Sequence, residues 1–355
     1  MRRDTLIPGM QPPSLNIADA PERVVLNRPF WALRSYGEGP RQRPAVLVAA
    51  PLSGHFGWIM RDVVLGLLQR HRVYLLEWKD ASEVPRNEGR FGLESNIAAI
   101  IEATRLLGPE IALLGVSQAP AAILAAAAIL AAAGDAARPR AMVLMGGYID
   151  PRRTPTAIGR IAAMLPPGWF SRVMARPVPS GRPGEGRLVY PGRAQRLALD
   201  RYLARHLATG GELAAKATDD DGLDPVAFPF LDLYSTLMDV PAEFAEDNLR
   251  AVFHDARLAS GRLTWRGETV DPGAIEDIAL MTVEGGRDDS SGSGQTEAAH
   301  GLCPRLPTRR RHHWTEPEAC HFRLFHGRLW RQSILPQVAD FVAGALKPRR
   351  RRRCE

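Results

Sequence analysis

Ser117, Asp288 and His321 lie far apart in the chain, yet their types and order are those of a nucleophile, an acid and a general base. A serine hydroxyl attacks an ester carbonyl only when an imidazole accepts its proton. A carboxylate beside the imidazole fixes its orientation and stabilises its charged form. The chain order serine, acid, histidine occurs in one large class of hydrolases. These residues therefore predict acyl transfer from an ester to Ser117.

The surroundings of Ser117 are those of a strained turn between a strand and a helix. An apolar run over residues 111–114 leads into the turn, and an alanine-rich stretch follows it. Gly115 and Ala119 are small enough for such a turn, and Pro120 suits the first turn of a helix. A serine at this position can also simply cap the helix. The strand before it and the helix after it favour the nucleophile.

Two neighbouring carboxylates, Asp288 and Asp289, compete for the role of the acid. Both follow a short apolar strand over residues 278–283, in a glycine-rich turn. The carboxyl end of a strand is where sheet enzymes gather their functional groups. Periodicity does not decide which carboxylate turns inward. We favour Asp288 and expect Asp289 to cap a helix that starts near Gly294.

His321 is the candidate base because it follows the last predicted strand, residues 309–314, in a loop. A helix over residues 295–302 is expected before that strand. His312 and His313 are alternatives, but they lie in the strand itself, beside three arginines. We interpret those two histidines as structural or surface residues.

Two backbone N–H groups are expected to bind the oxyanion that forms during acyl transfer. The first belongs to Gln118, the residue after the nucleophile, and the second belongs to the loop at residues 51–55. Leu52 is chosen over Ser53 from its place in that loop alone. Ser53 and His55 either shape the loop or contact substrate. The pair Trp169 and Phe170, at residues 169–170, either packs within a cap or lines a substrate cleft.

The elements that must position these residues have a regular order. Continuous apolar runs of strand length occur at residues 44–50, 73–78, 111–114, 141–145 and 278–283, and helical patterns separate several of them. Strands without polar alternation are typical of a parallel sheet that is covered on both faces. The sequence therefore predicts a doubly wound, mostly parallel α/β fold.

The rhythm of strands and helices breaks between residues 151 and 275. This segment contains a glycine-rich stretch (181–186), an acidic patch (219–221) and an amphipathic stretch (243–255). It is too long for a simple connection. We expect a core formed by residues 23–150 and 276–346, with a largely helical cap inserted at 151–275. Residues 1–22 are expected to be flexible, and residues 347–355 to form a disordered basic tail.

Composition narrows the class of protein. The chain has 355 residues, is 45% hydrophobic and carries a net charge of +7; without residues 347–355 the net charge falls to +2. The tail is a candidate for binding acidic surfaces, but a solvated end is the simpler interpretation, and no nucleic acid is expected. Three cysteines without regular spacing predict neither a disulfide framework nor a zinc site.

Cellular location is also constrained. No apolar stretch near the N-terminus has the form of a signal peptide. The longest apolar run, residues 119–133, is too short to span a bilayer. We expect a cytoplasmic protein without a transmembrane segment.

With these residues identified, the sequence resembles the intracellular poly(3-hydroxybutyrate) depolymerases of the α/β-hydrolase superfamily. The resemblance extends over nearly the whole chain and includes the segments 24–30, 50–55, 84–91, 145–150, 263–267 and, most specifically, 282–300. It implies hydrolysis of a storage polyester to 3-hydroxybutyrate or short oligomers, at or near cytoplasmic granules, without a metal or organic cofactor. It also assigns the acid to Asp288 and the base to His321.

The chain departs from the family pattern at the nucleophile turn. Many members have cysteine at the position of Ser117 and proline at that of Ala119, and many carry an N-terminal extension that we do not find here. A serine depends more fully on the histidine for activation than a cysteine does. The leading hypothesis is a serine esterase that acts on polyhydroxyalkanoate. The alternatives are an esterase for soluble hydroxyalkanoate oligomers, a non-catalytic granule protein and a polymerising synthase, against which Ser117 counts.

Overall fold

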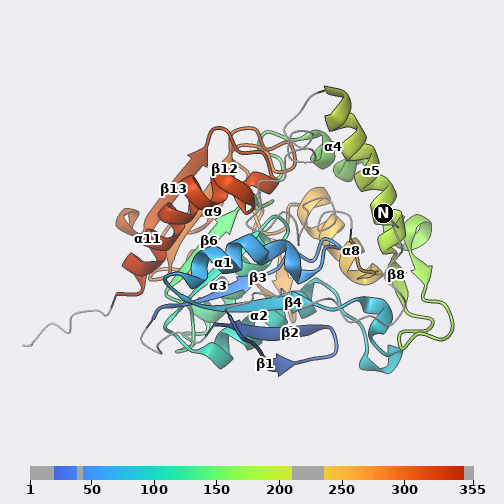
Figure 1. The fold of residues 1–355 in the computed structure, drawn as a ribbon, viewed down its shortest axis with the longest axis horizontal. Coiled ribbons are helices and arrows are strands. Elements are labelled where there is room, and N and C mark those ends of the chain that lie inside the picture. Colours follow the sequence, from blue (N-terminus) through green and yellow to red (C-terminus); the bar gives the residue numbers. More distant parts are fainter. Residues whose placement is uncertain (1–19, 38–42, 210–235, 348–355) are drawn as a thin grey trace, which may run out of the picture.

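A sheet of eight strands forms the centre of the molecule (Figure 1). The structure is a computed structural model and describes residues 20–37, 43–209 and 236–347. The strand order across the sheet is β1-β2-β4-β3-β5-β6-β12-β13. The bounds are β1 Glu22–Asn27, β2 Trp31–Tyr36, β3 Ala45–Ala49, β4 Arg72–Trp78, β5 Ile111–Val116, β6 Ala141–Met145, β12 Ala279–Gly285 and β13 Arg311–Glu316.

Six of these strands pair in parallel, from β4 to β13. All residues of β3, β5 and β6 are buried, because helices cover both faces of the sheet. The predicted doubly wound α/β fold is therefore confirmed. The antiparallel edge formed by β1 and β2 was not predicted, because β1 is largely exposed and has no continuous apolar run.

Two pairs of helices form the layers on the sheet. Helix α2 (Leu93–Leu107) packs against α3 (Ala119–Ala132), and α1 (Arg61–Leu68) packs against α11 (Leu335–Ala345). Helix α3 is buried nearly all round. Its many alanines are small enough to let it pack closely against the sheet. Its first residue follows Ser117 by two positions, so this buried helix fixes the turn that carries the serine.

A long insertion separates β6 from β12, which are neighbours in the sheet. Its described helical elements are α4 (Ala157–Met164), η4 (Phe170–Met174), α5 (Gly192–Thr209), α8 (Ala242–Asn248) and η5 (Leu249–His254). Two small antiparallel sheets accompany them, made of β7 (Arg176–Pro177), β8 (Leu188–Tyr190) and β9 (Val240–Pro241), and of β10 (Thr264–Trp265) and β11 (Glu268–Thr269). We call residues 151–275 the cap. The exact domain limits stay a prediction.

Several predicted segments lie wholly or largely outside the described residues. These are the acidic patch at 219–221, most of the N-terminal segment 1–22 and most of the tail 347–355. The amphipathic stretch at 243–255 forms α8 and then η5, a π-helical continuation of it. None of the described helices is both long and apolar enough to cross a bilayer.

The segment before the last strand differs from the prediction. Only Ala299–Leu302 (α9) of the expected helix at 295–302 is α-helical, and the strand occupies Arg311–Glu316 rather than 309–314. The cause is the buried carboxylate of Glu284, which accepts hydrogen bonds from the N–H groups of Gly294, Thr296 and Glu297. These bonds hold a compact turn where a helix would otherwise start.

Candidate active site

The backbone at Ser117 is strained in the way a nucleophile turn requires. Its φ is +59°, a left-handed conformation that non-glycine residues rarely adopt. A Cβ atom at Gly115 would lie 2.4 Å from Ile123 Cδ1 and 3.0 Å from Ala119 Cβ. Glycine is therefore required at position 115, and alanine at 119 fills the remaining space. The turn projects the serine side chain from the end of β5, at the start of α3.

Ser117, His321 and Asp288 form one hydrogen-bonded chain. Ser117 Oγ lies 2.9 Å from His321 Nε2, and His321 Nδ1 lies 2.9 Å from Asp288 Oδ2. The Asp288 side chain is fully buried and that of His321 is 6% exposed. The three side chains thus have the arrangement in which an imidazole can accept the serine proton while a carboxylate holds its other nitrogen.

Asp288 is oriented by its own loop. Its Oδ1 accepts hydrogen bonds from the N–H groups of Ser290 (2.8 Å) and Ser291 (2.9 Å), and its Oδ2 accepts one from Ser291 Oγ (2.9 Å). An aspartate that binds the backbone two and three residues ahead is a common local motif. The pattern aspartate, any residue, serine, serine is a sequence signal that could have distinguished Asp288 from Asp289, and it was not used.

Asp289 does not cap a helix near Gly294, contrary to expectation. Its carboxylate instead meets α5 of the cap, where it accepts a hydrogen bond from the Tyr202 hydroxyl. It also lies 2.9 Å from His206 Nε2 and 3.3 Å from an Arg205 guanidinium nitrogen. Neighbouring carboxylates therefore face different partners: Asp288 faces His321, and Asp289 fastens the cap.

Two opposing effects act on the pKa of His321. Burial is the largest effect and lowers it, but the charge and hydrogen bond of Asp288, together with the charge of Asp289, outweigh burial. The pKa of His321 is therefore raised above its usual 6.5. A more basic imidazole is a stronger acceptor for the serine proton, provided that the pH lies above this pKa.

The alternative histidines lie elsewhere. Both His312 and His313 are exposed on β13. His313 contacts Thr282 Oγ1 and Thr315 Oγ1, and His312 packs its ring edge against Phe341. The structure places neither side chain beside Ser117, which agrees with a structural or surface role.

The two expected oxyanion donors interact with each other. Gln118 is the N-cap of α3, where backbone N–H groups lack a partner within the helix. The Leu52 N–H, however, donates a 2.9 Å hydrogen bond to the side-chain Oε1 of Gln118. The Gln118 Nε2 reaches Asn248 Oδ1 of the cap at 3.5 Å. In this arrangement Leu52 is not free to bind an oxyanion, and the Gln118 side chain must move before it can.

The remaining predicted residues occupy two places. Ser53 is exposed, whereas His55 is buried, bridges to the backbone of Leu237 and packs its ring edge against Phe322, the neighbour of His321. Trp169 packs against Phe170, which in turn packs against Tyr190 of β8. Both ring contacts lie within the cap and do not involve Ser117, His321 or Asp288. The binding roles of all four residues stay predictions.

Sequence reasoning missed Gly146, which lies behind the hydrogen-bonded pair of His321 and Asp288. A Cβ atom there would lie 2.7 Å from Leu324 Cδ1, 3.4 Å from Asp288 Oδ2 and 3.5 Å from His321 Cε1. Its φ of +53° also favours glycine. The Gly146-Gly147 pair directly after a predicted strand was the available signal.

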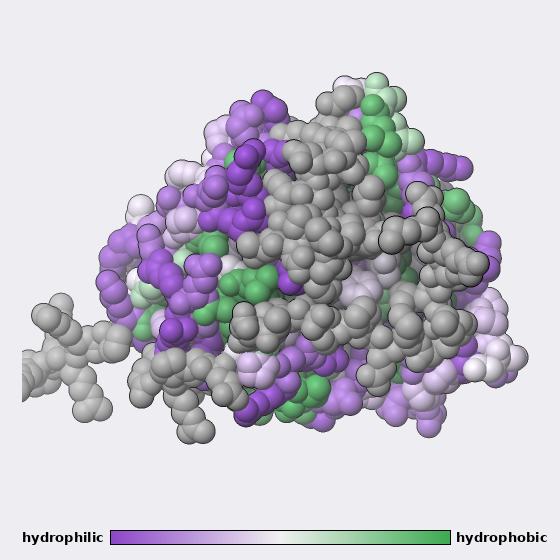
Figure 2. Space-filling model, in the orientation of Figure 1, coloured by the Kyte–Doolittle hydropathy of each residue, from purple (hydrophilic) through white to green (hydrophobic). Residues whose placement is uncertain are grey.

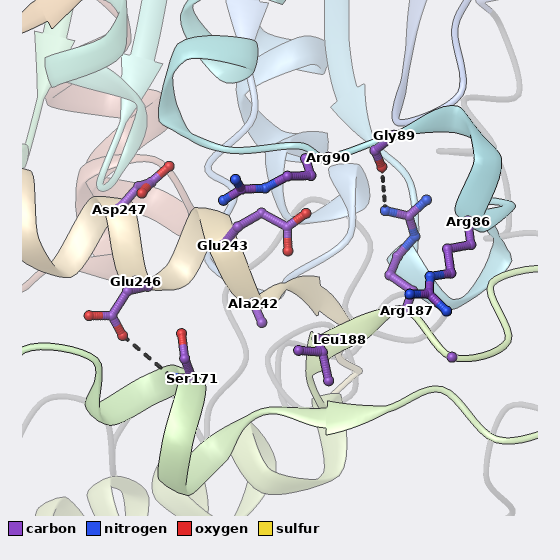
Figure 3. Close-up of a pocket in the computed structure, with 11 residues that line it drawn as sticks. Arg86, Gly89, Arg90, Ser171, Arg187, Leu188, Ala242, Glu243, Glu246 and Asp247 are labelled. Atoms are coloured by element: carbon purple, nitrogen blue, oxygen red, sulfur yellow. Dashed lines mark hydrogen bonds between the residues drawn. The ribbon is translucent and has the colours of Figure 1, made fainter.

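A pocket of about 460 Å³ lies between the cap and the loop at residues 86–90 (Figure 3). Three arginines and three carboxylates line it, so its charges balance: Arg86, Arg90, Arg187, Glu243, Glu246 and Asp247. The guanidinium of the buried Arg187 donates hydrogen bonds to the carbonyl oxygens of Val84, Pro85 and Gly89. Ser117, Asp288 and His321 do not line this pocket. Its walls come from the cap and from the loop at residues 86–90.

A family model matches more than half of the chain. The family model described as PHB de-polymerase C-terminus matches residues 146–345, a range that includes Asp288 and His321 and begins after Ser117. No curated protein matches the chain.

Solved structures show the fold. A putative epoxide hydrolase from Pseudomonas aeruginosa is 16% identical, with 97% of this chain and 100% of that chain covered and a TM-score of 0.56. For an enol-lactonase from Burkholderia xenovorans LB400 the values are 13%, 88%, 96% and 0.52. For a putative aryl esterase from Burkholderia cenocepacia they are 17%, 92%, 100% and 0.51. At these identities the similarity establishes the α/β-hydrolase fold alone.

Proposed function

The chain belongs to the PHB de-polymerase C-terminus family, and from this premise we propose that it degrades an intracellular poly(3-hydroxyalkanoate), of which poly(3-hydroxybutyrate) is the leading candidate, through a serine acyl-enzyme. The general activity of this protein is the hydrolysis of an ester bond. The observation that carries the proposal is the unbroken hydrogen-bonded chain from Ser117 Oγ through His321 to Asp288, with both contacts at 2.9 Å.

The proposed first half-reaction forms the acyl-enzyme. Ser117 Oγ attacks the carbonyl carbon of a polyester bond while its proton passes to His321 Nε2. The C=O π electrons move onto the carbonyl oxygen, which the Gln118 N–H and, after the Gln118 side chain has moved, the Leu52 N–H stabilise. The intermediate then collapses. The bond to the chain alkoxide breaks, and His321 returns the proton to that oxygen, which leaves as a free hydroxyl end.

The second half-reaction releases the acyl part. A water molecule gives one proton to His321 Nε2 and attacks the acyl carbon, and the bond to Ser117 Oγ breaks as the proton returns to that oxygen. Asp288 stays ionised throughout and stabilises the imidazolium. Each cycle therefore makes one carboxylic acid end and one hydroxyl end from one ester bond.

Covalent labelling tests the nucleophile. A serine-directed phosphonate should form a single adduct at Ser117, located by mass spectrometry of the digested protein. The His321→Ala variant should lose the labelling, because a serine without its base is a poor nucleophile. Ser53→Ala is the matched control, since Ser53 is an exposed serine in the loop at residues 51–55, and it should label like the unmodified chain. Labelling at another residue, or full labelling of His321→Ala, would contradict the proposed role of Ser117.

A second assay tests the substrate. The full chain is incubated with amorphous poly(3-hydroxybutyrate) particles and, separately, with the soluble 3-hydroxybutyrate dimer. Release of acid from the particles supports the polymer substrate. Turnover of the dimer alone would assign the protein to soluble oligomers, and turnover of neither would remove the ester specificity proposed here.

A further inference from the structure

Positive charge is concentrated in one part of the cap. Residues 151–209 contain eleven arginines, no lysine and two acidic residues, which gives a net charge of +9. The whole chain carries +7, so the rest of the protein is slightly acidic. The elements of this segment lie at one end of the molecule, away from α11 (Figure 1). We call the part of this segment from residue 153 to residue 207 the basic cap surface.

Most of these arginines are exposed and have no carboxylate partner among the described residues. Four arginines do form ion pairs: Arg152 with Asp150, Arg182 with Glu83, Arg196 with Asp200 and Arg205 with Asp289. A fifth, Arg187, is buried and donates hydrogen bonds to carbonyl oxygens. Those without a described ion pair are Arg153, Arg160, Arg172, Arg176, Arg193 and Arg201, all exposed. An unneutralised group of guanidiniums on one surface attracts anions and pairs readily with carboxylates.

The same surface exposes large apolar side chains. Among the described residues, six of the nine exposed large hydrophobic side chains belong to it: Ile161, Met164, Val173, Leu188, Leu197 and Leu207. Met164 is 75% exposed and Leu197 is 64% exposed. The 18-residue helix α5 buries only Gly192 and Gln195. In Figure 2, hydrophobic and hydrophilic side chains stand next to each other at this end of the molecule.

Exposed apolar side chains in such number normally mark a binding surface. We propose that the basic cap surface docks onto the surface of a polyester particle that carries carboxylate groups. This inference rests on the proposed function. Hydrolysis leaves an ionised carboxylate at each cut, so a particle under degradation is both apolar and negatively charged. The aliphatic side chains then insert among polyester segments while the guanidiniums pair with carboxylate ends.

The basic cap surface is attached to a loop of the candidate site. Asp289 binds Tyr202 and His206 of α5 and immediately follows Asp288. A particle that contacts α5 is therefore held next to the loop that carries the acid.

The mixed character of the surface favours a polyester over nucleic acid. Single-stranded nucleic acid is bound by basic grooves with aromatic rings on which the bases stack. Here the exposed large apolar residues are aliphatic, which suits an apolar solid. An anionic lipid bilayer is the competing partner, and it forms a separate arm of the test.

The test measures binding without hydrolysis. The full-length Ser117→Ala protein, which cannot form the acyl-enzyme, is sedimented with amorphous poly(3-hydroxybutyrate) particles. The number of carboxylates on the particle surface is measured beforehand. Two variants alter the basic cap surface: Arg153→Gln with Arg193→Gln and Arg201→Gln, and Ile161→Ser with Met164→Ser and Leu197→Ser. Each should weaken particle binding by about tenfold or more, since both charge and apolar contact contribute. Added salt should weaken binding of the parent protein.

Matched controls make the same changes elsewhere. Arg86, Arg90 and Arg309 are exposed arginines that form no ion pair with the described residues. Val24, Val25 and Leu106 are the other exposed large hydrophobic side chains in the described part of the chain. Glutamine at the first three positions, or serine at the second three, should change particle binding less than about twofold, as surface substitutions usually do. Equal losses in the cap and control variants would overturn the proposal.

Two further measurements distinguish a polyester partner from a lipid partner, and a failure of docking from a failure of the proposed function. If phosphatidylglycerol vesicles bind the parent protein as tightly as the particles do, the surface recognises anionic lipid and the proposal is wrong. With Ser117 intact, the cap variants should hydrolyse a soluble butyrate ester at the unmodified rate. If no protein hydrolyses the soluble ester, the proposed function fails, whereas an intact soluble activity with unchanged particle binding defeats the docking surface alone.

Discussion

At the scale of single residues, the neighbouring carboxylates Asp288 and Asp289 both act on the basicity of His321. Both lie near His321, but only Asp288 hydrogen-bonds to it, and both contribute charge that raises the pKa of the imidazole. Because a protonated imidazole cannot accept the serine proton, activity should fall as the pH drops through this raised pKa. The acid limb of the pH profile is thus a direct readout of the surrounding charges.

Asp289→Asn should shift this acid limb to lower pH. The change removes one of the negative charges that raise the pKa of His321 while leaving the hydrogen bond of Asp288 in place. The measurement is kcat/KM against pH for a soluble ester. In the unmodified chain the midpoint should lie above the ordinary histidine value of 6.5. Asp135→Asn, at an aspartate paired with Arg105, should leave the midpoint unchanged. An unshifted midpoint in Asp289→Asn would show that its charge does not reach the imidazole.

Gln118→Met should accelerate acylation. The Gln118 side chain accepts the Leu52 N–H in the resting structure and so competes with the developing oxyanion. Methionine has a similar length but offers only a weak acceptor. Loss of one competing hydrogen bond, about 1 kcal/mol, corresponds to about a fivefold faster acylation in single-turnover measurements. Asn248→Ala should have a smaller effect, because its contact with Gln118 is long, at 3.5 Å. Slower acylation in Gln118→Met would mean that the amide instead holds the loop in its active shape.

At the level of elements, glycines fix how closely the strand ends approach one another. Gly146→Ala should impair catalysis more than Gly134→Ala, although both residues have a left-handed φ (+53° and +60°). Each substitution introduces backbone strain of about 1–2 kcal/mol. Only at position 146 does the new methyl group meet Leu324 and approach His321 and Asp288, whereas nothing lies within 4 Å at 134.

The two glycine variants are compared by thermal unfolding and by kcat. We expect similar strain in both, a further loss of stability in Gly146→Ala of about 1–3 kcal/mol from overpacking, and a kcat lowered by about tenfold or more through displacement of His321. Equal kcat values would show that the histidine tolerates the methyl group.

Elements also explain which features the sequence can predict. The buried strands β3, β5 and β6 were found because both faces are covered, which leaves continuous apolar runs. The turn at Ser117 was found because Gly115, the strand and the helix give a local pattern. The role of Asp289 could not be found, since its partners Tyr202 and His206 are more than eighty residues away. The Glu284 turn, which replaced the expected helix, depends on a buried carboxylate whose partners no periodicity reveals.

At the level of the whole molecule, the charged surface of the cap and the strand ends of the site belong to different parts of the chain. The basic segment at 151–209 is part of an insertion between two neighbouring strands of the sheet, and residues 210–275 of the same insertion carry a net charge of −8. This separation lets the surface of the cap change its partner without altering the strand ends that hold Ser117 and His321. Because Arg187 and the α5 contacts fasten the cap to the core, changes on the outer surface need not disturb the hydrogen-bonded chain.

Acid sensitivity of the whole fold should come partly from His300. Burial, with a smaller effect of the His313 charge, lowers the pKa of His300 to about 4. The unfolded chain binds this proton near pH 6.5 and the folded chain only near pH 4, so the contribution of neutral His300 is complete above pH 6.5 and is lost as the pH falls toward 4. Because His300 is only partly buried and water screens its charge, this contribution to the free energy of unfolding amounts to about 1–2 kcal/mol. His300→Gln should therefore flatten the fall in the free energy of unfolding over this range, measured by urea denaturation at several pH values.

His254→Gln, at a histidine that contacts the Ala162 carbonyl in the cap, serves as the control. An unchanged slope in His300→Gln would mean that other groups, such as the buried His71 whose pKa burial also lowers, account for the acid sensitivity.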